Sequence, residues 1–195
     1  MSVILAKGES VPLAVASSGQ ADFAVGLGWN RRDTEGEGDG PEFDLDVCAF
    51  LLQPNGKVSS DSDFVFYNNP VAAGGSVTLT KDNVTGAGEG DDEQIKINIA
   101  KVPASVDVIA FGVAIRDAEA RRQSFGQVPG AIARLVDGSG EEVASFDLQE
   151  DSSTEITLIF GELYRADGHW SFRALGQGFR GGLSKLAASY GLNAA

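Results

Sequence analysis

The sequence contains one cysteine, Cys48, one histidine, His169, and no long apolar run. A single thiol cannot form an internal disulfide, so the fold is expected to have no cross-links. One Cys and one His also cannot build a zinc or copper site from soft ligands. No apolar run approaches the ~20 residues of a membrane span, and the start lacks the features of a signal peptide. We therefore expect a cytoplasmic protein that does not span the membrane.

Basic residues are also scarce, with 15 Lys and Arg against 28 Asp and Glu, which gives a formal net charge of −13. Binding to a phosphate backbone needs a basic face. The densest basic group is Arg116, Arg121 and Arg122, and Asp117 and Glu119 interrupt it. A nucleic-acid partner is therefore not expected.

The acidic residues are concentrated in two stretches that contain no Lys or Arg. Asp33–Asp46 carries seven carboxylates and Asp82–Glu93 carries five. Without these 12, the chain has 16 acidic against 15 basic residues. Both stretches border apolar segments, so the carboxylates cannot simply move apart. Such crowding is costly unless a cation lies between them.

The pattern of apolar residues predicts an all-β protein. At 195 residues, the chain suits a single domain over residues 1–195. About ten short strands with tight turns between them favour a sandwich of two antiparallel sheets. The expected strands are Ser10–Val15, Phe23–Leu27, Phe43–Leu52, Phe64–Asn68, Val77–Thr80, Ile95–Ile99, Val106–Ile115, Ala131–Val136, Glu142–Leu148, Ile156–Tyr164 and Trp170–Leu175. Leu183, Leu186, Ala187 and Tyr190 have helical spacing and predict a short C-terminal helix.

The first candidate metal ligands are Asp44 and Asp46. In an extended segment, both lie on one face, roughly 7 Å apart, and can reach one ion or two adjacent ions. Cys48 follows on the same face and is expected in the core. The two acids therefore lie where the strand leaves the core, at an end of the sandwich where ligands are commonly held.

The second candidate is the loop Asp82–Glu93, which alternates glycines with acidic residues. Glycines let the backbone turn its carbonyls inward, and Asp and Glu supply hard oxygens between them. Calcium takes 6–8 such oxygens in a flexible shell, whereas magnesium tends to use one or two carboxylates with waters. The loop lacks the EF-hand pattern. The composition therefore favours calcium over magnesium.

Two further groups leave alternatives open. Asn68 and Asn69 precede Pro70 and supply amide oxygens, but Asn and Pro also favour turns. Beside two acidic loops, a ligand role and a turn role are about equally supported. Asp117 and Glu119 follow an expected buried strand, and their mixed-sign surroundings favour local ion pairs over metal binding.

Several segments together resemble the TerD family of tellurite-resistance and stress-response proteins. They are Phe43–Asp46, Asp63–Asn69, Asp82–Glu93, Asp117–Arg121, Phe125–Val128 and Phe160–Arg165, in this order. The resemblance implies a bacterial cytoplasmic β-sandwich that binds two adjacent Ca²⁺ ions at one end. It also implies action with other Ter-system proteins, including a membrane-embedded partner, and no established catalytic reaction. Carried over by position, the ligands are Asp44, Asp46, Asn68, Asn69, Asp82, Asp91 and Glu93, with carbonyls from Gly86 and Gly88.

The leading hypothesis is a non-enzymatic calcium-binding scaffold or switch. The alternative is a hydrolase that uses paired carboxylates or a metal ion, since Asp44 and Asp46 meet the roughly 5–10 Å spacing of glycosidase acids. Five or more nearby acids suit an ion better than one shared proton. Direct tellurite reduction is not expected either, because internal dithiol chemistry needs two thiols and the chain has one.

Overall fold

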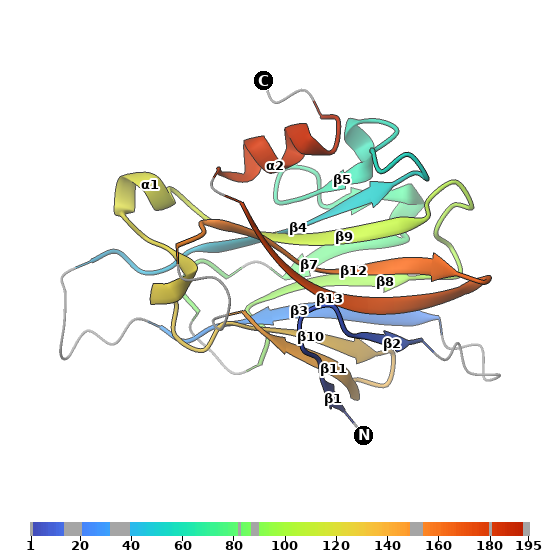
Figure 1. Cartoon of the computed structure of the whole chain (residues 1–195), viewed down its shortest axis with the longest axis horizontal. Helices are drawn as coiled ribbons and strands as arrows, with labels where there is room; N and C mark the ends of the chain where they lie inside the picture. Colours follow the sequence, from blue (N-terminus) through green and yellow to red (C-terminus); the bar gives the residue numbers. More distant parts are fainter. Residues whose placement is uncertain are drawn as a thin grey trace.

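The computed structural model describes residues 2–13, 21–31, 40–81, 83–86, 90–148, 154–179 and 181–192. These residues form two packed sheets and two short helices (Figure 1). The strands are β1 Val3–Ile4, β2 Ser10–Pro12, β3 Asp22–Gly28, β4 Leu45–Leu52, β5 Phe64–Val65, β6 Val71–Ala72, β7 Val77–Lys81, β8 Glu93–Asn98, β9 Val108–Ile115, β10 Ile132–Asp137, β11 Glu142–Asp147, β12 Thr157–Ala166 and β13 His169–Phe179. The helices are α1 Ala118–Arg121 and α2 Leu183–Ser189.

The strands divide into a seven-stranded and a six-stranded sheet. Sheet A has the order β1-β11-β10-β3-β8-β7-β6, and sheet B has the order β2-β13-β12-β9-β4-β5. All pairs are antiparallel except β1 with β11, which is parallel. The predicted sandwich is therefore confirmed, although the described residues contain 13 strands rather than about ten.

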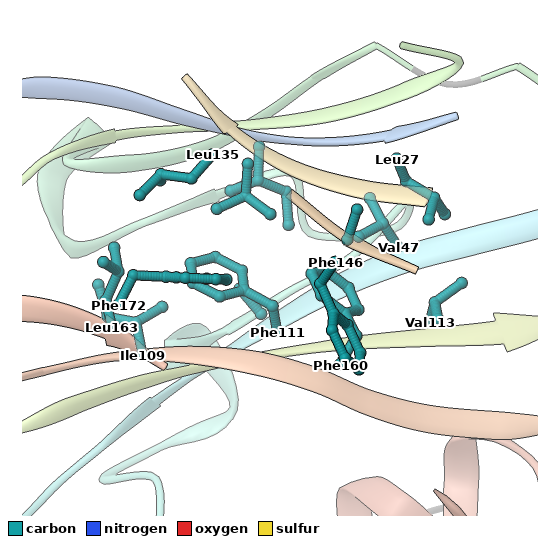
Figure 2. Close-up of a cluster of buried hydrophobic side chains, with 14 of the residues drawn as sticks. Leu27, Val47, Ile109, Phe111, Val113, Leu135, Phe146, Phe160, Leu163 and Phe172 are labelled. Atoms are coloured by element: carbon teal, nitrogen blue, oxygen red, sulfur yellow. The ribbon is translucent and has the colours of Figure 1, made fainter. Parts of the chain in front are cut away.

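The main core lies between the two sheets, where alternate residues of each strand point inward (Figure 2). From sheet A come Leu27 and Leu135, and from sheet B come Val47, Phe111 and Phe160, all nearly inaccessible to solvent. Burying large apolar side chains of this kind is the dominant stabilising term in folding. This core fixes the relative position of the two sheets, and with it the end where the acidic stretches enter β4 and β8.

A second apolar cluster lies on the outer face of sheet B, beneath α2. Cys48 and Phe50 point to this face of β4, and Leu186 of α2 packs onto them. Gly112 on β9 leaves room for this contact, since a Cβ there would lie 2.9 Å from Cys48 Sγ and 3.1 Å from Leu186 Cδ2. The predicted C-terminal helix is confirmed, and its apolar face covers one outer face of the sandwich.

Some local features differ from the sequence-based expectation. The expected strand Phe64–Asn68 ends at Val65, because residues 66–69 form a tight turn closed by hydrogen bonds between Phe66 and Asn69. The short strands β1 and β6 carry too few residues for period-2 alternation to predict them. In the described part of the chain, no helix is long and apolar enough to cross a membrane.

Candidate functional site

Asp44 and Asp46 lie at the start of β4, on the strand face that points away from the main core. Asp44 is only 8% exposed, its Oδ2 lies 3.8 Å from Nη1 of Arg116, and its carbonyl accepts a hydrogen bond from the Arg116 amide. Asp46 is half-buried and lies opposite Ala114 of β9. The prediction that both acids lie where the strand leaves the core matches this geometry.

Asp46 lines an open cavity of about 730 Å³ at this end of sheet B. The cavity is bounded by the ends of β4 and β9, the segment 116–120 and the start of α2, and its charged residues are Asp46, Arg116, Asp117, Glu119 and Lys185. The Arg116 guanidinium lies over the Tyr67 ring, 5.2 Å from its centroid. Asp117 and Glu119 therefore line the same cavity as Asp46. Two basic side chains, Arg116 and Lys185, line it as well.

Glu93, at the start of β8, joins the second acidic stretch to the first. Its side chain is buried, and Oε2 accepts a hydrogen bond from the backbone amide of Val47, 3.2 Å away on β4 of the opposite sheet. Oε1 accepts a second hydrogen bond, 3.0 Å long, from the amide of Asn83. The Glu93 carboxylate therefore lies beside the residue that follows Asp46, and it links the two sheets at this end.

Asp92 is equally buried but has different partners. Its Oδ2 accepts a hydrogen bond from the Trp29 amide at 3.0 Å, and its Oδ1 accepts one from the Asn83 side chain at 2.8 Å. Asn83 in turn accepts the amide of Thr85 through its side-chain oxygen. Asp92 and Asn83 thus hold the start of the glycine-rich loop against the end of β3.

Asp91 points to the outer face of sheet A. Its Oδ1 accepts hydrogen bonds from the Arg134 guanidinium of β10, including one of 2.9 Å from Nε. The carboxylate lies over Gly26 of β3, where a Cβ would come within 2.1 Å of Oδ2. The absence of a side chain at Gly26 therefore makes room for this ion pair. Three successive acids, Asp91, Asp92 and Glu93, consequently make three different sets of contacts.

The glycines of the loop are only partly described. Gly86 is buried with φ of 66°, in the left-handed region that favours glycine, and a Cβ there would lie 2.4 Å from Trp29 Nε1. Its role in the structure is thus close packing against an indole. Asp82 and Gly88, which the family resemblance proposes as ligands, lie outside the described residues.

Asn68 and Asn69 lie in the turn after β5. The Asn69 side-chain amide donates a 2.7 Å hydrogen bond to the carbonyl of Phe64, while its backbone closes the turn with Phe66. Asn68 is exposed. For Asn69, these contacts supply a structural role in the turn. The neighbouring Tyr67 is the residue of this turn that lines the cavity with Asp46.

The donor types at this end suit a hard cation, because Asp44, Asp46 and Glu93 offer only carboxylate oxygens. Among the described residues, however, no three His, Cys, Asp or Glu side chains are grouped closely enough to hold a metal ion. The buried thiol of Cys48 does not change this, since burial raises its pKa far above the ordinary value and keeps it protonated. The described carboxylates thus suit calcium by donor type alone.

Sequence reasoning did not single out the residues that position these carboxylates. Arg116, Arg134, Asn83 and Trp29 are far from one another in sequence and match no metal-site pattern. The one available signal was the run Asp91-Asp92-Glu93 itself, because three neighbouring acids on an extended chain cannot all point to one side.

Comparison with known proteins places this arrangement in a family. The family model described as "TerD domain" matches residues 1–190. The chain is 57% identical over 195 residues to "Tellurium resistance protein TerD" of Serratia marcescens, and each chain is covered completely. It is 48% identical over 193 residues to "General stress protein 16U" of Bacillus subtilis (strain 168), which covers 98% of each chain. These two names describe resistance and stress response, and neither describes a catalysed reaction.

Solved structures support the same fold. A protein of unknown function matches with a TM-score of 0.73 at 20% identity and covers 90% of this chain and 99% of its own. A homologue of telluride resistance protein (TerD) from Streptomyces coelicolor A3(2) matches with a TM-score of 0.71 at 20% identity and covers 87% of this chain and 96% of its own. At this identity, the likeness concerns the fold alone. With the match of the family model and the close relatives, the observations show that the chain belongs to the TerD family of tellurium-resistance and stress proteins.

Proposed function

We propose that the chain is a non-enzymatic calcium-binding protein of a bacterial tellurium-resistance and stress-response system. The observation that carries the proposal is the contact of Glu93 with the Val47 amide, because it brings the second acidic stretch beside Asp46 of the first. Of the 12 carboxylates in the two stretches, Asp44 and Asp46 from the first and Glu93 from the second are described at this end of the sandwich. A cation there would offset their mutual repulsion.

In this proposal, Asp44, Asp46, Glu93 and Asp82 provide the carboxylates of one or two adjacent Ca²⁺ sites. Gly86 and Gly88 carbonyls and the amides of Asn68 and Asn69 are the further candidates. Asp91 is the weakest candidate, since its carboxylate is held by Arg134 on the outer face of sheet A. When bound, calcium would supply positive charge that ties the loop after β7 to the start of β4.

Binding of this kind stabilises the folded state by RT ln(1 + c/Kd), where c is the free calcium concentration. At a hundredfold excess over Kd, the gain is about 2.7 kcal/mol. The ordered end would then present the cavity of Asp46, Arg116 and Lys185 in one arrangement. This is how the protein would act as a scaffold or switch for other Ter-system proteins, including a membrane-embedded partner.

A calorimetric titration of the chelator-treated protein with calcium and with magnesium tests the binding proposal. We expect calcium to bind more tightly, and Asp46→Asn to weaken calcium binding at least tenfold, about 1.4 kcal/mol. Asp61→Asn is the matched control, because Asp61 is an exposed carboxylate in a turn outside this end. No heat of binding, together with an unchanged melting temperature in millimolar calcium, would contradict the proposal.

The partner proposal needs its own test. Pelleting with vesicles that contain anionic lipid, with and without calcium, would show whether calcium connects the protein to an anionic surface. A calcium-dependent increase in the pelleted fraction that Asp46→Asn abolishes is the expected result. Equal pelleting under both conditions would contradict a role at the membrane surface. The proposed scaffold would then bind proteins only.

Neither alternative gains support from the structure. No observation favours the hydrolase alternative, and the relatives are resistance and stress proteins rather than members of a known enzyme class. Direct reduction of tellurite at Cys48 is disfavoured because the thiol is fully buried beneath α2. We expect resistance to be retained in Cys48→Ser, and its complete loss in a folded variant would contradict an indirect role.

A further inference from the structure

A second open cavity, of about 570 Å³, lies on the outer face of sheet A, on the opposite sheet from the cavity that Asp46 lines. It extends over β3, β8 and β7. The turn of residues 73–76 and the hairpin turn of residues 137–140 form its sides, together with Lys101. Its volume falls in the range of about 300–1,000 Å³ that is usual for small-molecule sites.

The hollow has a simple origin in the register of sheet A. Val136 of β10, Ala24 of β3, Lys96 of β8 and Thr78 of β7 lie side by side in one row across four strands. Ala24 is the smallest of these side chains, so the surface of the sheet is lowest at β3. Longer side chains on either side, Val136 and Lys96, then form walls. No described helix covers this face, whereas α2 covers the outer face of sheet B (Figure 1).

The cavity is rich in hydrogen-bond donors that have no partner among the described residues. Lys96 and Lys101 are both exposed, and neither ammonium group makes an ion pair or hydrogen bond with a described residue. Ser76 also lines the cavity; its hydroxyl is buried and makes no hydrogen bond with a described residue. A buried hydroxyl without a partner is costly. Because this hydroxyl has almost no exposed surface, Ser76 borders the cavity without offering its hydroxyl to a ligand.

The two carboxylates that line the cavity are already engaged. Asp22 Oδ1 accepts a 2.7 Å hydrogen bond from the Asn98 side chain. Asp137 Oδ1 accepts hydrogen bonds from the hydroxyl and amide of Ser139 and from the amide of Glu141, and these lower the pKa of Asp137. One oxygen of each carboxylate is thus used within the protein, and both carboxylates remain charged, while neither ammonium group has a partner among the described residues.

The backbone at one wall is strained at Ala73. Ala73, Gly74 and Gly75 have successive φ angles of 48°, 65° and 88°, and Ala73 is not a glycine. Residues held in the left-handed region cluster at binding sites because the surrounding structure must maintain them. Here, the strained turn leads directly into Ser76.

We propose that this cavity binds a small phosphate ester, with the phosphate between Lys96 and Lys101 and with Thr78 as the hydroxyl donor. Two ammonium groups match the double charge of a phosphate better than the single charge of a carboxylate. The remaining polar side chain, Gln94, would contact the hydroxyl groups of the esterified part. This inference does not depend on calcium binding at the other sheet.

Nitrogen-proton correlation NMR of the full-length protein tests the proposal, with glycerol 3-phosphate as the probe and ionic strength held constant with NaCl. We expect saturable shifts of the amides of Ser76, Lys96, Asn98 and Lys101. The double variant Lys96→Gln/Lys101→Gln should weaken binding at least tenfold. Thr78→Glu, which places a carboxylate in the cavity and leaves both lysines present, should also weaken it. Shifts that stay linear in concentration, or that are equal at all exposed lysines, would overturn the proposal.

Two controls separate this site from the acidic end. Lys185→Gln removes an exposed ammonium from the other cavity and should leave the affinity unchanged. The titration is run with chelator and again with calcium. Binding that requires calcium and survives Lys96→Gln/Lys101→Gln would overturn the proposal and assign the phosphate to the acidic end. Glycerol at the same concentrations should cause no saturable shift, and equal binding of glycerol would show that the phosphate is not recognised.

Discussion

The two groups of carboxylates, Asp44 with Asp46 on β4 and Asp91–Glu93 before and in β8, differ in what surrounds them. In the β8 group, each acid accepts hydrogen bonds from fixed protein donors: Arg134, Trp29, Asn83 and the Val47 amide. In the β4 group, Asp46 is half-buried and lines an open cavity. Both groups consist of acidic residues, but the β8 group is built into the fold, whereas in the β4 group Asp44 is buried beside Arg116 and Asp46 borders solvent.

This difference shows that a high density of acids does not by itself define a metal site. A buried carboxylate that accepts backbone amides has a structural role before any ion is considered. Glu93 has both features, since it stabilises the join between the sheets and lies beside Asp46. Asp91, by contrast, is turned to the other side of sheet A.

The largest expected effect is on stability, in the β8 group. Glu93→Ala leaves the amides of Val47 and Asn83 without their acceptor, so we expect a loss of about 2–4 kcal/mol in the free energy of unfolding. Urea denaturation of the chelator-treated protein measures it. Asp46→Ala is the matched comparison and should cost less than about 1 kcal/mol. Equal losses in both variants would show that the two groups do not differ as described.

A second prediction concerns another ionisable group, Tyr190, which follows α2 at its C-terminal end and packs against Phe50. Burial, and next the charge of Glu162, raise the pKa of Tyr190 from 10 to about 12. Above pH 10 the unfolded state therefore loses this proton first, so stability falls as the pH rises from 10 to about 12. We expect a loss of about 1–2 kcal/mol over this range, after allowance for partial exposure.

Denaturation at several alkaline pH values measures this loss, and Tyr190→Phe should remove it. The difference between the two proteins isolates Tyr190 from other groups that titrate above neutral pH. An identical pH dependence with and without the hydroxyl would show that α2 does not bury this residue as the structure has it.

The smallest effect concerns the ion pair on the outer face of sheet A. Arg134→Gln removes the partner of Asp91, and we expect a loss of about 0.5–1 kcal/mol that shrinks at high salt. Arg31→Gln, which breaks the more exposed pair with Glu42, should have a smaller effect. The calcium affinity of Arg134→Gln sharpens the comparison further, because it should not change if Asp91 is only a structural acid. A tenfold change would place Asp91 in the calcium site.

The alternation of apolar residues was sufficient to predict the long strands and the C-terminal helix. Period-2 alternation predicted β8, which has one buried face. An apolar run on both faces predicted β4 as a central strand, and β4 is buried on both faces, as is β9. Strands of two residues, such as β1 and β6, have no pattern to detect. Their position is decided by neighbouring strands that supply hydrogen-bond partners.

The sequence by itself determined the fold class, the family and the two places where negative charge is concentrated, since these depend on local pattern and composition. Only the tertiary structure decided which carboxylate points where. Asp91, Asp92 and Glu93 are adjacent in sequence, yet their partners come from β10, the end of β3 and β4. Such pairings depend on the register between strands and on the packing of the two sheets, and a linear pattern of residue types does not specify them.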